Sequence, residues 1–91
     1  MVGCLIANWQ CLPVGAKPKL GVVTSRKIGG AVQRNRARRL LRESFRQHQS
    51  ELAQAVEIIL VARNSIAGRA FSEVEKDYLT ALKRAGLLKQ L

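Results

Sequence analysis

Apolar residues gather in three short segments of the chain, and each segment predicts a β-strand. The segments are residues 2–12, 19–25 and 56–62. The third, Val-Glu-Ile-Ile-Leu-Val-Ala, is apolar at both alternating sets of positions, which is typical of a strand in the interior of a sheet. Residues 13–18 begin and end with proline and contain Gly15, a composition typical of a turn. We therefore expect the first two strands to pair as a hairpin.

Two longer segments have apolar residues at helical spacing. The helix predicted over residues 31–52 follows Gly29-Gly30 and has one apolar stripe, with His48 at its edge: Ala37, Leu41, Phe45, His48 and Leu52. A polar stripe runs beside it, flanked by Arg38: Asn35, Arg39, Arg42 and Arg46. The last helix is predicted to begin with a capping box, Ser72 to Glu75, and to end at Gly86. Its apolar stripe is Val74, Tyr78, Ala81, Leu82 and Ala85.

The predicted order is therefore β-β-α-β-α, in a single domain over residues 1–91. Neither internal repeats nor a long linker divide the chain. The strand–helix–strand unit predicts a parallel pair of strands, and the general rule makes such a crossover right-handed.

Composition supports a folded domain with a modest core. Hydrophobic residues form 47% of the 91 residues, and aromatic residues only 4%. Leu, Ile, Val and Ala must therefore supply most of the core, with Trp9 and Tyr78 expected in the core or packed on the sheet. Cys4 and Cys11 would stand roughly 23 Å apart on one strand, too far for a disulfide. We expect reduced thiols and a cytoplasmic protein, because the sequence contains neither a secretory signal nor a membrane span.

Positive charge is concentrated in one part of the chain. The formal net charge is +10, and residues 26–46 hold eight basic residues against one acid, Glu43. An ordinary solvated helix face usually mixes the two signs. This excess indicates a polyanionic partner, with nucleic acid favoured over an anionic membrane surface.

The basic residues also occupy an unfavourable place for stability. Arg34 and Arg36 lie in the first turns of the predicted helix, where cations oppose the helix dipole and cost about 0.3–1 kcal/mol each. A bound phosphate backbone would offset that cost. Arginine binds phosphate through two donors and stacks on bases, and Asn35 can reach a 2′-hydroxyl or a base edge.

The run from Thr24 to Glu43 resembles the signature of the ribonuclease P protein family. The matching motifs are Ser25-Arg26-Lys27, Ile28-Gly29-Gly30-Ala31-Val32, Arg34-Asn35-Arg36 and Leu40-Leu41-Arg42-Glu43. The later strand ending Ile59-Leu60-Val61-Ala62-Arg63 and the terminal helix also match, so the resemblance covers nearly the whole chain.

This resemblance implies a fold and a function. The implied fold is an α/β (α+β) sandwich, ribosomal-protein-S5-domain-2-like, with a small mixed sheet and a left-handed βαβ crossover, against the general rule. The implied function is that of the protein subunit of an endoribonuclease, which helps a catalytic RNA to remove the 5′ leader of precursor tRNA. The implied partners are that RNA and precursor tRNA, without a membrane or a required protein partner. The RNA-binding residues would be Arg26, Lys27, Arg34, Asn35, Arg36, Arg38, Arg39, Arg42 and Arg46.

The resemblance also implies that the protein itself has no catalytic residue and binds no metal. Magnesium ions held by the RNA would hydrolyse the phosphodiester. Consistent with this, His48 is the only histidine, at a helix edge. Glu73, Glu75 and Asp77 lie in a first helical turn, where acids complement the dipole; a metal site is the less favoured interpretation.

One departure concerns the N-terminus. Family members usually begin with a basic helix carrying phenylalanines, which forms one wall of a cleft for the leader, whereas this sequence starts close to its first strand. By resemblance, Arg38 and Arg42 line that cleft. Because the helix that forms its other wall is not found in this sequence, we expect weaker leader binding. A non-enzymatic RNA-binding module of ribosomal-protein type is the main alternative; a DNA-binding regulator and a peripheral membrane protein are weaker ones.

Overall fold

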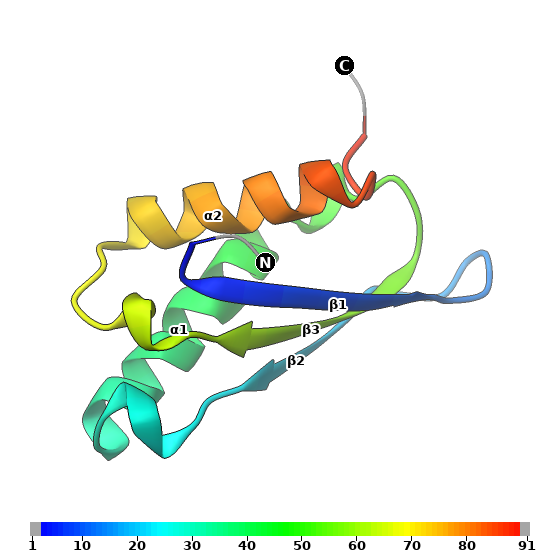
Figure 1. Ribbon diagram of the computed structural model, residues 1–91. Coiled ribbons are helices and arrows are strands. Elements are labelled where there is room, and N and C mark those ends of the chain that lie inside the picture. The colour runs from blue at the N-terminus through cyan, green and yellow to red at the C-terminus, as the bar shows by residue number, and fades with distance from the viewer. Residues whose placement is uncertain (1–2, 90–91) are drawn as a thin grey trace.

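The computed structural model describes residues 3–89, which form a three-stranded sheet packed against two helices (Figure 1). The strands are β1 (Leu5–Cys11), β2 (Lys19–Val23) and β3 (Val56–Ala62), and the helices are α1 (Ala31–His48) and α2 (Phe71–Arg84). Three short 3₁₀ turns join them: η1 (Arg26–Ile28), η2 (Gln49–Glu51) and η3 (Asn64–Ile66). The predicted order β-β-α-β-α is confirmed. Val2, included in the first predicted strand, lies outside the described residues.

The sheet has the order β1-β3-β2, so β3 is the central strand, as its apolar sequence predicted. It pairs antiparallel with β1 and parallel with β2. The predicted hairpin between β1 and β2 is wrong, although its turn forms and the Ala16 amide donates to the Pro13 carbonyl over 3.0 Å. The physical reason is that β3, the most apolar strand, buries most surface between two neighbours.

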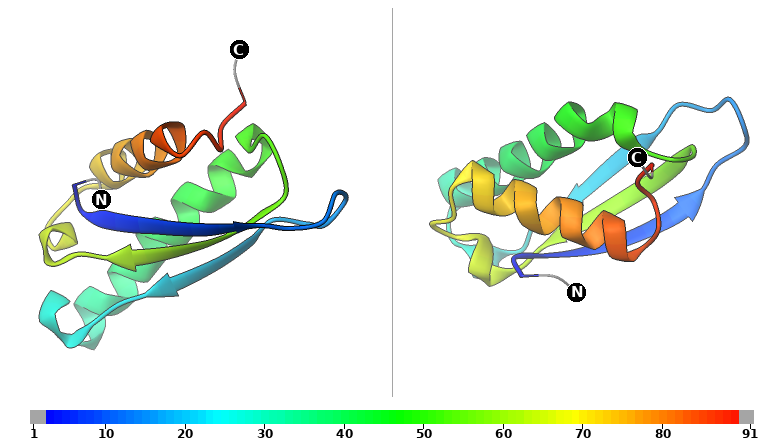
Figure 2. Two further views of the ribbon diagram at one scale, coloured as in Figure 1. Left: turned by 45° about the vertical axis from the view of Figure 1, so that its right-hand side comes forward. Right: turned by 90° about the horizontal axis from the view of Figure 1, so that it is seen from above.

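The crossover from β2 through α1 to β3 is left-handed. In Figure 1 both strands run from right to left, and α1 passes behind the sheet, which the view from above in Figure 2 confirms. The sense expected from the general rule is therefore wrong for this chain, and the sense implied by the family resemblance is confirmed.

The core lies between one face of the sheet and the two helices. Its fully buried side chains include Leu5, Leu41, Ile58, Leu60 and Tyr78. Along β3 every second residue, from Val56 to Ala62, is buried against the helices. Trp9 departs from the expectation of a core residue, because it lies on the edge strand β1 and its side chain remains 46% exposed.

Among residues 3–89, no helix covers the other face of the sheet. Ile59 of β3 and Val23 of β2 lie there with 37% and 49% of their surface exposed. Glu57 and Val61, which alternate with the buried residues of β3, are half-buried on the same face. The sheet thus presents an open, partly apolar surface.

The helix ends differ in detail from the expectation. Helix α1 follows Gly29, whose φ of 140° favours glycine, and ends at His48, after which η2 tightens the chain. Helix α2 begins at Phe71, and the carboxylate of Glu73 accepts a hydrogen bond from the Ala70 amide over 3.2 Å. The predicted capping box of Ser72 and Glu75 is wrong, since Glu75 is instead bonded to His48. Gly86 ends the helix with a positive φ, as predicted.

Candidate nucleic-acid interface

Helix α1 has an apolar face on one side and a basic face on the other. Its buried residues are Ala37, Leu41, Ser44 and Phe45, and they pack on the sheet and on α2. The predicted polar stripe is exposed over its whole length: Asn35, Arg39, Arg42 and Arg46. The two-stripe prediction is therefore confirmed, and a helix packed on the core exposes these arginines to solvent.

The three residues of the Arg34-Asn35-Arg36 motif lie in different surroundings. Arg34 is half-buried, and its Nε atom is enclosed without a hydrogen-bond partner among residues 3–89. Asn35 is exposed, and its Oδ1 accepts a hydrogen bond from Nη1 of Arg38 over 3.3 Å. Arg36 reaches across to the segment before α2, where its Nη2 donates to the carbonyl of Arg69 over 2.5 Å. Asn35 and Arg36 are both exposed, but within the described part of the chain only Arg36 is bonded to another element, the segment before α2.

Arg46 differs from the other exposed arginines because it forms an ion pair with Glu43, one helical turn away. The Arg46 guanidinium lowers the pKa of Glu43 to about 2, with help from a hydrogen bond from Gln47. Exposed pairs of this kind contribute little stability. The pair does neutralise part of the charge at this end of α1, so the free positive charge is strongest toward Arg39 and Arg42.

Arg26 and Lys27 are exposed on η1, which the buried Ile28 anchors to the core. They follow the end of β2. The neighbouring parallel strand β3 ends at the same edge, and there Arg63, Asn64 and Ser65 join Lys27 around an open groove of about 440 Å³. The sequence alone did not indicate these three residues as candidates. The predicted parallel pair was the signal for them, because the carboxyl ends of parallel strands meet at one edge.

The same edge also fixes the start of β1. The carbonyl of Gly3 accepts hydrogen bonds from Arg63 Nη1 over 2.8 Å and from Ser65 Oγ over 3.2 Å. The Cys4 amide donates to the carboxylate of Asp77 in α2 over 3.0 Å. Burial, and then the Asp77 carboxylate, raise the pKa of the Cys4 thiol to about 12, so this thiol is unreactive at neutral pH. Cys4 and Cys11 are both free, as expected.

His48 joins the end of α1 to α2. Its Nε2 is bonded to Glu75 of α2 over 2.9 Å, and its Nδ1 to Glu51 of η2. The hydrogen bond to Glu75, followed by the contribution of Glu51, raises the pKa of His48 above its usual value, against the effect of burial. His48 therefore links the end of α1 to η2 and α2 through its two ring nitrogens. Within residues 3–89, no helix has the length and apolar character needed to cross a membrane.

Similar proteins share both sequence and fold with this chain. A protein from Syntrophomonas wolfei, named ribonuclease P protein component, is 44% identical over 69 residues, which cover 76% of this chain and 58% of that protein. The chain thus spans about three fifths of the length of that relative. A protein of the same name from Brevibacillus brevis is 33% identical over 94 residues, covering 97% of this chain and 75% of that protein.

Solved structures agree with the sequence relatives. The ribonuclease P protein of Staphylococcus aureus superposes with a TM-score of 0.80 at 27% identity, over 96% of this chain and 79% of that one. The protein of Thermotoga maritima gives a TM-score of 0.76 at 27% identity, over 89% of this chain and 76% of that one. The model of the ribonuclease P family matches residues 7–86, from within β1 to just past the end of α2. The chain belongs to the ribonuclease P protein family.

Proposed function

We propose that this chain is the protein subunit of a bacterial ribonuclease P. It binds the catalytic RNA through the basic face of α1 and assists endonucleolytic removal of the 5′ leader from precursor tRNA. Two features support the proposal: the family membership, and the name ribonuclease P protein component that its relatives carry.

The observation that carries the proposal is the basic face itself. Helix α1, packed on the core through its apolar face, exposes arginines from its first turns to its end, and only one acid lies among them. Such a surface matches the regular negative charge of a folded RNA backbone, where each contacted phosphate releases a counterion. The exposed basic residues of η1, Arg26 and Lys27, extend the same surface toward the sheet edge.

In this proposal the chain binds and orients RNA and does not carry out the chemistry. Magnesium ions held by the RNA would activate the attacking water and stabilise the leaving oxygen. The basic side chains of α1 would lower the electrostatic repulsion between the catalytic RNA and its tRNA substrate, because both RNAs are polyanions. No further protein partner is required, and the site of action is the cytoplasm.

The 5′ leader has a candidate path over the open face of the sheet. Lys27 and Arg63 lie beside that face, at the edge where β2 and β3 end, whereas Arg38 and Arg42 belong to α1, which covers the opposite face. Ile59 and Val23 give that face an apolar surface on which bases can pack.

Co-purification tests the proposal in cells. A tagged form of the chain, expressed in a bacterium and recovered at moderate salt, should retain one predominant RNA, which sequencing identifies as ribonuclease P RNA. A matched form with Arg34, Arg39 and Arg42 changed to glutamine should lose it. Recovery of ribosomal subunits instead would support an RNA-binding module of ribosomal-protein type and contradict the proposal.

A further inference from the structure

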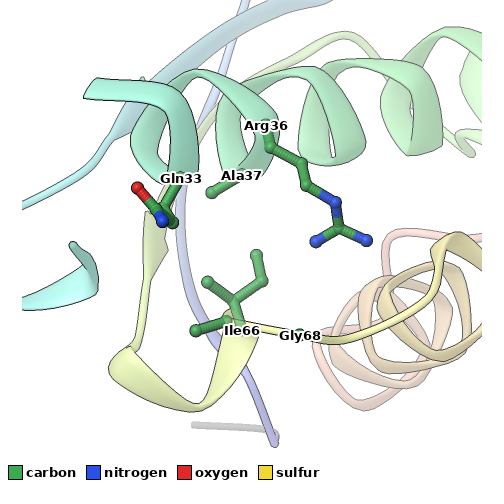
Figure 3. A pocket seen from close by; sticks show the side chains of 6 residues that line it. Gln33, Arg36, Ala37, Ile66 and Gly68 are labelled. Carbon is green, nitrogen blue, oxygen red and sulfur yellow. The ribbon is translucent and has the colours of Figure 1, made fainter. Parts of the chain in front are cut away.

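A small hollow lies between the first turns of α1 and the segment that links η3 to α2 (Figure 3). Its volume is about 140 Å³. The floor is apolar, because the side chains of Ala37 and Ile66 line it and are themselves 2% and 1% exposed. The remaining lining residues are Gln33, Arg36, Ala67 and Gly68.

The two polar side chains stand at opposite ends of this hollow. Figure 3 shows Gln33 at one end and the Arg36 guanidinium at the other, reaching toward the segment that contains Gly68. Arg36 is held there by its hydrogen bond to the Arg69 carbonyl. Gln33 packs over Gly29, where an added Cβ would lie 3.1 Å from the Gln33 Cβ. Neighbouring parts of the chain therefore support both ends.

The size and chemistry of the hollow fit one planar ring with polar edges. An enclosed apolar cavity of about 150 Å³ accommodates benzene, so a single aromatic ring fits this volume. The carboxamide of Gln33 can donate and accept hydrogen bonds, and a guanidinium can donate or stack. An aliphatic ligand would leave these groups without partners. The arginines of α1 favour a ligand attached to negative charge.

We propose that this hollow binds one unstacked nucleobase of the RNA that α1 contacts. The base would lie against the exposed Ala67, above the nearly buried Ala37 and Ile66. Its edge would meet Gln33, and its phosphates would lie along the arginines. This inference rests on the proposed function and specifies it: besides phosphate contacts, the interface contains one pocket for a base.

Two variants without a change of charge test the pocket. Ala67→Leu fills it, and Ala67 is exposed with an extended backbone that accepts a larger side chain. Gln33→Ala removes the polar end. Each should weaken binding to ribonuclease P RNA by at least about fivefold, the lower end of what one stacked base contributes. The slope of log affinity against log salt should stay unchanged, because it counts phosphate contacts.

Ala53→Leu is the matched control, since Ala53 is exposed and lies outside the pocket. It should bind like the original chain, and all three variants should keep its melting temperature. Probing the complex with dimethyl sulfate and a carbodiimide, which together report on all four bases, should find one base protected by the original chain and reactive with Ala67→Leu.

Unchanged affinity of both variants, with an unchanged probing pattern, would overturn the nucleobase pocket while leaving the proposed function intact. Failure of the original chain to bind ribonuclease P RNA would be a different result, since it would contradict the proposed function itself.

Discussion

At the scale of single residues, neighbouring basic side chains of α1 have different environments because a helix turns by about 100° per residue. Arg34 lies beside the apolar stripe, Asn35 faces solvent, and Arg36 faces the segment before α2. The sequence motif predicted one shared role for all three residues. In the structure, Arg36 also links α1 to the segment before α2, because its guanidinium donates a hydrogen bond to the Arg69 carbonyl. Helical periodicity could not indicate this contact, since the partner is a backbone group far away in the sequence.

Arg39 and Arg42 offer the cleanest test of phosphate binding. Both are exposed, and neither forms an ion pair within residues 3–89. Changing both to alanine should weaken binding to ribonuclease P RNA by about tenfold or more, since a hydrogen bond to a charged group contributes about 1.5–3 kcal/mol. The salt slope should fall by about two units in electrophoretic mobility or filter-binding measurements.

The matched control is Arg84→Ala together with Lys83→Ala, which removes the same charge from the exposed end of α2. This control should retain most of the affinity. Equal losses in the two double variants would mean that net charge, and not the face of α1, determines binding.

Arg36→Ala should lower stability as well as binding. The Arg69 carbonyl loses its partner, which costs about 0.5–1.5 kcal/mol for a hydrogen bond of this kind. Urea unfolding should detect this loss, whereas the Arg39 and Arg42 variants should unfold like the original chain. The expectation from sequence, that Arg36 contributes only to binding, would be supported instead if Arg36→Ala left the unfolding midpoint unchanged.

At the scale of elements, local pattern predicted the strands and helices but not how the strands pair. The apolar run of Val56–Ala62 indicated an interior strand, and the strand–helix–strand order indicated its parallel pairing with β2. Nothing local shows that β3 inserts between β1 and β2. Sheet order depends on burial summed over the whole core, so the expected hairpin was wrong although its turn was right.

The candidate site, too, was predicted where it depends on local sequence pattern and not where it depends on tertiary structure. The basic stripe of α1 was visible in the sequence, because it depends on helical periodicity alone. The groove of Lys27 with Arg63, Asn64 and Ser65 was not, since it requires two strand ends to meet. Among the acids of α2, Glu73 caps the helix and complements its dipole, while Glu75 and Asp77 bind side-chain or backbone partners outside the helix.

The contact between α1 and α2 through His48 should make stability depend on pH. Because its carboxylate partners raise the pKa of His48 in the folded state, the contribution is fully present below the unfolded value of about 6.5. It is lost as the pH rises through the folded value. Its size should be about 1 kcal/mol, since the side chains of His48 and Glu75 are 17% and 29% exposed and therefore partly screened.

Unfolding by urea between pH 5.5 and pH 8.5 measures this contribution. His48→Gln should be less stable than the original chain at pH 5.5 and should approach it at pH 8.5. Glu75→Gln should reduce the same pH dependence. A constant difference between His48→Gln and the original chain across this range would show that the contact depends on packing and not on charge.

At the scale of the whole molecule, the two faces of the sheet are unequal. Helices α1 and α2 cover one face (Figure 2), while the other exposes Val23 and Ile59 beside the basic groove. By the family resemblance, an additional phenylalanine-bearing helix would lie next to such a face, as a wall of the leader cleft. Within residues 3–89 this face is uncovered, so base contacts made there are accessible to water and to screening ions.

A version of the chain carrying the first helix of a relative tests this asymmetry. It should prefer precursor tRNA over mature tRNA more strongly than the 91-residue chain does, because each base stacked on an aromatic ring contributes about 1–3 kcal/mol. It should also melt at a higher temperature, because apolar surface is covered. If leader preference and melting temperature are equal in the two proteins, the leader path is not on this face.

The central claim is that the basic face of α1 assists a catalytic RNA. The most direct measurement is the rate of precursor tRNA cleavage by bacterial ribonuclease P RNA at a magnesium concentration too low for the RNA alone. Adding this chain should restore cleavage at the 5′ end of the mature tRNA, and the variant with Arg39 and Arg42 changed to alanine should restore it only at higher protein concentration. Absence of cleavage with the intact chain, or equal activity of the two proteins at every concentration, would contradict this account.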